Sequence, residues 1–188
     1  MISKIFYLVP GFNVWDQGKK TVAKFKEPIE ARGHAAKVLP YGWTGLAGVR
    51  LCDQKLAMVL AALSEPGTIF LGHSNGCAIG SFAADNGAPF EGMIFINPAL
   101  DRTWRPPEQV KWLHVYYNKH DWATFVAAGL VAHRWGAMGH LGPDYDDARV
   151  KVYDTGEMWD TFGHSGVFHD FNFWGHLILT QAEKEIEK

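Results

Sequence analysis

The sequence predicts an α/β protein, a three-layer α/β/α sandwich around a mostly parallel sheet of about six strands. Six short β-rich runs alternate with helix-patterned stretches along the chain, and this alternation predicts a parallel sheet with helices on both faces. Most of the runs are almost continuously apolar, as expected for strands buried on both faces. The 188 residues are expected to form one domain, 1–188, because single cores commonly extend to about 200 residues.

The predicted elements follow one another in chain order. The strands are expected at residues 4–9, 35–39, 68–71, 93–96, 112–117 and 150–153. The helices are expected at residues 18–31, 49–63, 75–84, 122–134 and 173–187. Turn residues support two of the boundaries, since Gly33 ends the first helix and Pro66-Gly67 precedes the third strand. Segment 98–109 contains two adjacent prolines, and segment 136–147 contains three glycines and a proline; both are predicted to be loops near the functional face.

Composition excludes several classes of protein. The formal charge of −2 and the lack of a Lys/Arg cluster argue against a nucleic-acid partner. The longest apolar run, residues 125–132, is far shorter than the ~20 residues of a membrane span. The first apolar run is too short for the core of a signal peptide, and two cysteines suggest no disulfide framework. We therefore expect a soluble, cytoplasmic protein.

The run Gly-His-Ser-Asn-Gly at residues 72–76 joins a predicted strand to a predicted helix of small residues. A strand that turns at once into a helix forces the residue between them into a strained conformation. Glycines two positions before and after that residue avoid collisions with neighbouring backbone. Ser74 is therefore predicted to be a nucleophile at the carboxyl edge of the sheet, above the positive end of a helix dipole. Ser165 also lies between glycines, but their spacing is wrong and no helix is predicted immediately after it.

This strand–motif–helix unit resembles the nucleophile elbow of α/β-hydrolases. The order of elements over nearly the whole chain is similar to that of the compact, lidless members of that superfamily. The resemblance implies the minimal α/β-hydrolase fold, with the first strand beside both the second and the third. It also implies a serine esterase or lipase-like enzyme with a catalytic triad.

The triad of this superfamily runs in the order Ser, Asp or Glu, His. Asp121 follows the fifth predicted strand, where the resemblance places the acid, although an aspartate there also suits the N-cap of the next helix. Asp101, after the fourth strand, is the alternative acid. His164 lies in the loop after the last strand and resembles the family's Gly-His pair, and His169 is the alternative base. His73, inside the elbow, is expected to pack away from the substrate.

Two backbone N–H groups are expected to form the oxyanion hole. One belongs to Asn75, the residue after the nucleophile. The turn at residues 10–12 looks like the family's His-Gly-x turn, with Pro10 in place of the usual His. By that resemblance, Phe12 supplies the second N–H.

The predicted reaction is hydrolysis of a small-molecule carboxylic ester, with thioesters and amides left open. No cofactor or metal is predicted, because the chain has neither a His-Glu-x-x-His pattern nor a glycine-rich nucleotide-binding motif. Two alternatives are a catalytically silent hydrolase fold used for binding and a metal-dependent hydrolase built on the nine histidines. The sequence does not indicate an oligomeric state. The short segment after the fourth strand predicts an open cleft, which loop tryptophans could line: Trp104, Trp122, Trp135 and Trp159.

Overall fold

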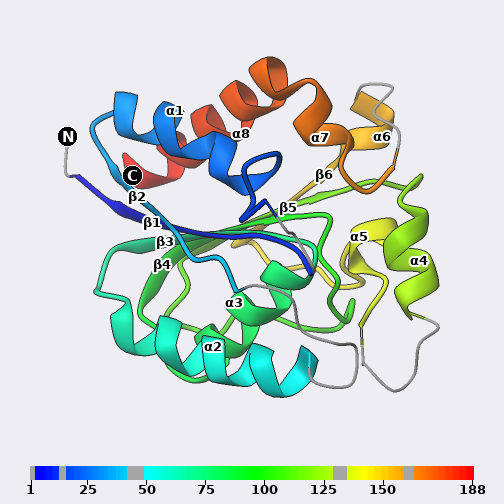
Figure 1. Ribbon diagram of the computed structural model, residues 1–188, viewed down its shortest axis with the longest axis horizontal. Coiled ribbons are helices and arrows are strands. Elements are labelled where there is room, and N and C mark those ends of the chain that lie inside the picture. Colours follow the sequence, from blue (N-terminus) through cyan, green and yellow to red (C-terminus); the bar gives the residue numbers. More distant parts are fainter. Residues whose placement is uncertain (1–2, 13–15, 42–48, 129–134, 159–162) are drawn as a thin grey trace.

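A parallel sheet forms the centre of the computed structural model, which describes residues 3–12, 16–41, 49–128, 135–158 and 163–188. Within these residues six strands pair in the order β2-β1-β3-β4-β5-β6, and every pair is parallel (Figure 1). The strands are β1 (Ile5–Val9), β2 (Ala35–Val38), β3 (Thr68–His73), β4 (Phe90–Ile96), β5 (Trp112–Tyr117) and β6 (Val150–Asp154). The predicted fold class and the place of the first strand between the second and third are confirmed.

Helices cover both faces of this sheet. The 3-10 helix η1, α1 and α8 lie on one face, and α2 and α3 lie on the other (Figure 1). Shorter helices gather at the carboxyl end of the strands. The bounds are η1 (Val22–Phe25), α1 (Lys26–Ala31), α2 (Val49–Leu63), α3 (Asn75–Asp85), α4 (Trp122–Ala128), α5 (Met138–Leu141), α6 (Thr155–Met158), α7 (Gly166–His169) and α8 (Phe171–Ile186).

The side chains of β1 show how the sheet separates two cores. Phe6 and Leu8 pack on the face covered by α1 and α8, in a cluster that includes Trp174. Tyr7 and Val9 point to the opposite face and pack in a cluster with residues of α2 and α3. This alternation follows from the two-residue period of a strand, and it buries β1 on both sides.

Two predicted elements differ from those observed. The helix expected at residues 18–31 is shorter, because Gly18 has φ +81° and lies in a turn whose N–H groups bond to Asp16. The predicted loop 136–147 contains the short helix α5. The helix expected at 122–134 begins at Trp122 as predicted, but residues 129–134 lie outside the described part. None of the described helices is both long and apolar enough to cross a membrane.

Candidate active site

Ser74 occupies the sharp turn between β3 and α3. Its backbone has φ 55° and ψ −124°, in a region that non-glycine residues seldom adopt. The N–H of Ser74 donates to the carbonyl of Ile96 at 3.0 Å, and its own carbonyl accepts from Cys77 and Ala99. These bonds hold the strained residue between β3, β4 and the start of α3, as the strand–turn–helix pattern predicts.

The glycines of the motif are required by close backbone contacts. A Cβ on Gly72 would lie 2.9 Å from the backbone nitrogen of Cys77, and one on Gly76 would lie 2.3 Å from the carbonyl oxygen of Val9. Real Cβ atoms do not approach backbone this closely. Both positions therefore admit only glycine, and Gly76 lets the elbow pack directly against the end of β1.

Asp121 and His164 meet across 43 residues of sequence, with His164 Nδ1 2.7 Å from Asp121 Oδ2. The carboxylate is fully buried at the end of β5 and accepts two further hydrogen bonds, from Asn97 Nδ2 at 3.0 Å and from the Thr124 N–H at 3.1 Å. Burial opposes ionisation of Asp121, but these donors outweigh it and lower the pKa of its carboxyl group. Asp121 is therefore a carboxylate at neutral pH, and it fixes the proton of neutral His164 on Nδ1.

Asn97 is a site residue that sequence reasoning missed. It directly follows β4, is buried, and has φ 46°. The neighbouring strands β3 and β4 are thus each followed by a non-glycine residue with positive φ, Ser74 and Asn97. Its amide reaches the acid from the strand beside β5. An asparagine directly after a buried strand is the only signal that the sequence carries for it.

The alternative candidates are not brought into this arrangement. The Asp101 carboxylate is exposed and accepts hydrogen bonds from Thr103. His169 is exposed on α7 and lines a different hollow, near Lys24. Ser165 is the N-cap of α7, so a one-turn helix does follow it, but the two described residues before it, Gly163 and His164, are not in a strand.

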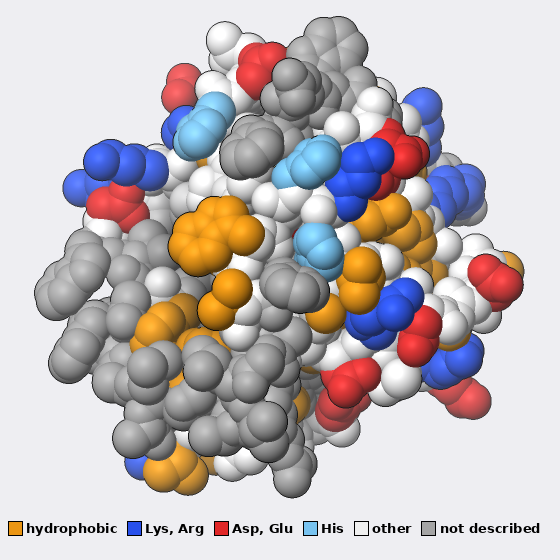
Figure 2. Space-filling model, turned by 90° about the vertical axis from the view of Figure 1, so that its right-hand side faces the viewer, with side chains coloured by type: hydrophobic (Ala, Val, Ile, Leu, Met, Phe, Trp, Pro, Cys, Tyr) orange, Lys and Arg blue, Asp and Glu red, His pale blue; other side chains and the backbone are white. Residues whose placement is uncertain are grey.

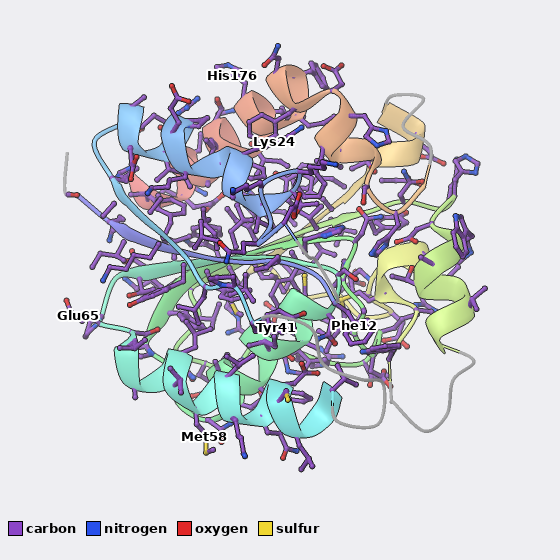
Figure 3. All side chains as sticks on the ribbon, in the orientation of Figure 1. Phe12, Lys24, Tyr41, Met58, Glu65 and His176 are labelled. Carbon is purple, nitrogen blue, oxygen red and sulfur yellow. The ribbon has the colours of Figure 1, made fainter. Side chains whose placement is uncertain are left out.

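Phe12 and Asn75, the two residues expected to form an oxyanion hole, line the same pocket as Ser74. Asn75 opens α3, where backbone N–H groups have no acceptor within the helix. A Cβ on Gly11 would lie 3.1 Å from the Cβ of Ser74, so the loop that carries Phe12 passes directly beside Ser74. Figure 3 shows Phe12 near the start of α3, at the carboxyl end of the sheet.

A pocket of about 200 Å³ opens beside Ser74. Among the described residues, its lining contains the candidate nucleophile Ser74 and the candidate base His164, and most of the remaining wall is apolar. The lining residues are Phe12, Ser74, Asn75, Ala99, Ala123, Thr124, Trp135 and His164. Figure 2 views this edge of the molecule, where histidine and apolar side chains gather.

The predicted tryptophan lining is right at one position. Trp135 lines the pocket, whereas Trp104 packs against Phe95 and donates to Asp85. Trp122 is exposed and borders a separate hollow. Trp159 lies outside the described residues.

His73 is buried and touches the candidate base. Its Nε2 lies 3.1 Å from the carbonyl oxygen of His164, and the two rings are 4.8 Å apart. Because a carbonyl only accepts, His73 carries its proton on Nε2. The expected packing role is therefore accompanied by a hydrogen bond that ties the elbow to the loop of His164.

Comparisons with solved structures identify the fold. A protein from Xanthomonas campestris pv. campestris, assigned to the α/β-hydrolase superfamily, matches with a TM-score of 0.54 and 17% identity. That match covers 94% of this chain and 98% of the other. The chain has the α/β-hydrolase fold.

Two further structures share the α/β-hydrolase fold with this chain. The pyrethroid hydrolase PytH matches with a TM-score of 0.59 and 12% identity over 100% of both chains. A monoacylglycerol lipase from Paleococcus ferrophilus matches with a TM-score of 0.58 and 11% identity, covering 97% of this chain and 94% of that one. No family model matches the sequence, and comparison with curated proteins gives no match.

The candidate residues lie where the α/β-hydrolase fold presents its site, at the carboxyl ends of the strands. Ser74 follows β3, Asp121 follows β5, and His164 follows β6. In the described part of the chain, no three His, Cys, Asp or Glu side chains gather in a way that could hold a metal ion.

Two buried histidines make the stability of this α/β-hydrolase fold sensitive to acid. Burial lowers the pKa of His73 to about 3 and that of His114 on β5 to about 4, although Glu185 lies near His114. Both bind a proton more weakly when folded, so their contribution is complete above about pH 6.5 and is lost as the pH falls towards 4. We expect the free energy of unfolding in urea to fall between pH 6.5 and 4.5 by on the order of 1 kcal/mol per pH unit for each histidine.

The variant His114→Phe separates the contribution of His114 to the pH dependence of stability from that of His73. It keeps an aromatic ring among Trp112, Tyr116 and Tyr153 but removes the titratable group. The slope against pH should be smaller than in the wild type but should not vanish, since His73 remains and burial also lowers the pKa of His34. Equal slopes in the two proteins would contradict this explanation.

Proposed function

We propose that the protein is a serine hydrolase that cleaves a carboxylic ester through an acyl-enzyme. The observation that carries the proposal is the 2.7 Å contact between His164 Nδ1 and Asp121 Oδ2, made by a histidine that lines the same pocket as Ser74. A strained serine, an oriented imidazole and a buried carboxylate form the combination that activates a hydroxyl for attack. The structural neighbours described above as hydrolases or a lipase support this choice.

In the proposed reaction, His164 Nε2 takes the proton of Ser74 while the serine oxygen adds to the ester carbonyl carbon. The N–H groups of Phe12 and Asn75 stabilise the negative charge that develops on the carbonyl oxygen. Collapse of this intermediate breaks the bond to the alcohol, which leaves with the proton from His164. Water then attacks the acyl-enzyme with the same base, releasing the carboxylic acid and free Ser74. Thioesters and amides can follow the same sequence of steps.

Labelling with a fluorophosphonate tests the proposal, because this reagent modifies only an activated serine. We expect the folded wild-type protein to gain one covalent adduct, detected by intact mass, and Ser74→Ala to gain none. The matched control is Ser165→Ala, which removes the other serine flanked by glycines and should leave labelling unchanged. Absence of an adduct on folded wild-type protein would overturn the proposal.

The same samples distinguish the two alternatives. Ester hydrolysis that is abolished by a chelator but not by the fluorophosphonate would indicate a metal-dependent hydrolase. A folded protein that binds esters without either labelling or turnover would indicate a binding module.

A further inference from the structure

The side chain of Asn75 is the centre of a buried polar network behind the pocket. Its Nδ2 lies 2.8 Å from Oδ1 of Asp53 on α2 and 3.1 Å from the hydroxyl of Tyr41. Its Oδ1 accepts a hydrogen bond from Nε1 of Trp135 at 2.7 Å. Figure 3 shows Tyr41 beside the start of α3, where Asn75 lies. One amide thus connects the residue after the nucleophile to three distant segments.

The chemistry of the partners fixes the direction of this amide. An indole N–H only donates, so it must face Oδ1, and the Asp53 carboxylate accepts, so it must face Nδ2. Asn75 and Asp53 are almost completely buried, where an unsatisfied polar group would cost about 1–3 kcal/mol. Rotating the amide by half a turn would oppose donor to donor at Trp135, so the network has one favourable arrangement.

Trp135 is consequently held as a fixed wall of the pocket. Its ring centroid lies 5.5 Å from that of Phe12, the other large side chain in the lining. The next residue, Gly136, packs so tightly that a Cβ there would lie 2.1 Å from the carbonyl oxygen of Leu100. The indole is therefore constrained through its N–H, its ring face and the backbone that follows it.

The size of the pocket and the charge of its lining indicate which chemical groups can bind in it. Among its described lining residues there is no Lys, Arg, Asp or Glu. A cavity of roughly 150 Å³ can hold a benzene ring, and a chain carbon takes about as much room as a water, roughly 30 Å³. A pocket of about 200 Å³ therefore accommodates one ring or about six chain carbons.

We propose that Trp135, held by the side chain of Asn75, is the specificity-determining residue of the acyl site and restricts it to short, uncharged acyl groups. The inference rests on the proposed function, because it assigns this pocket to the acyl half of the ester. The pocket holds a short aliphatic chain or a single aromatic ring, whereas a longer chain collides with the indole of Trp135. An acyl group with a carboxylate finds no cationic partner in the described lining.

The test is a series of p-nitrophenyl esters from acetate to decanoate, with kcat/KM measured for each. For the wild type we expect a maximum at four to six carbons and at least a tenfold fall by decanoate. Trp135→Ala should move the maximum to longer chains. Ala123→Leu, which changes another lining residue of the pocket, should move it to shorter chains and carries little risk to folding, because Ala123 is only half-buried on α4.

The hydrogen bond is tested by Trp135→Phe, which keeps a large ring but loses the donor to Asn75. We expect a broader chain-length profile, with the ratio of butyrate to decanoate reduced about tenfold. The matched control is Trp104→Phe, which removes an equivalent Nε1 bond, to Asp85, away from the pocket lining. That variant should keep the wild-type profile.

The outcomes separate this inference from the function on which it rests. A wild type that is labelled by fluorophosphonate but hydrolyses all chain lengths equally would overturn the inference alone. Unchanged profiles in both Trp135→Ala and Ala123→Leu would do the same. Failure of both labelling and hydrolysis would overturn the proposed function.

Discussion

Asp121→Asn is expected to lower kcat for ester hydrolysis by roughly 10³- to 10⁴-fold, with little change in KM. All three polar partners of this carboxylate are donors: His164 Nδ1, Asn97 Nδ2 and the Thr124 N–H. An amide offers one acceptor and one donor, so its NH₂ group must oppose at least one of them. Where NH₂ faces His164, the imidazole moves its proton to Nε2, and the nitrogen meant for Ser74 no longer accepts.

The measurement is steady-state hydrolysis of p-nitrophenyl butyrate, with folding checked by circular dichroism. Asp101→Asn is the matched control, because Asp101 is the alternative acid, after the fourth strand, and its carboxylate accepts hydrogen bonds from Thr103. That variant should retain activity within about twofold of wild type. Loss of activity in Asp101→Asn, with activity retained in Asp121→Asn, would contradict this prediction and identify Asp101 as the acid.

Gly76→Ala is expected to destabilise the fold by more than about 4 kcal/mol, or to prevent folding. The added Cβ would lie 2.3 Å from the Val9 carbonyl oxygen and 2.5 Å from that of Pro10. Both atoms belong to the backbone at the end of β1, which is paired with β2 and β3 and cannot move without breaking the sheet. Urea denaturation followed by fluorescence gives the free energy of unfolding.

Gly33→Ala is the control for the general cost of losing a glycine. Gly33 has φ +83° and no atom within 4 Å of an added Cβ, so only its backbone conformation opposes the change. We expect a cost of about 1–2 kcal/mol there. A similarly small loss of stability in Gly76→Ala would show that the elbow is not in rigid contact with the backbone of Val9 and Pro10.

The layer order of the fold could be predicted because its signals are local and repeated. Continuous apolar runs such as that of β3, which is buried at every position, indicate strands covered on both faces. The start of the first helix could not be placed, because its sequence is compatible with a helix from Gly18. The turn at Gly18 depends on hydrogen bonds from its backbone to the Asp16 side chain.

The candidate site could be predicted where it depends on a local sequence motif, and could not be predicted where it depends on tertiary packing. Ser74 stands in a motif whose glycines are explained by contacts, and the order of Ser74, Asp121 and His164 follows from the resemblance. Sequence could rank Asp121 above Asp101 only by position. Asn97 and the network around Asn75 escaped prediction, because which polar side chains share a buried volume is decided by tertiary packing.

The strand order has a consequence for how the molecule is made. Each strand after the first pairs with one already synthesised: β2 and β3 with β1, β4 with β3, β5 with β4, and β6 with β5. A nascent chain can therefore extend its sheet during translation by adding each new strand to an edge that has already been synthesised. His164 follows β6, so the elbow of Ser74 is complete long before its proposed base emerges. Hydrolytic competence would then appear only after His164 has been made, once the sheet that supports it is already built.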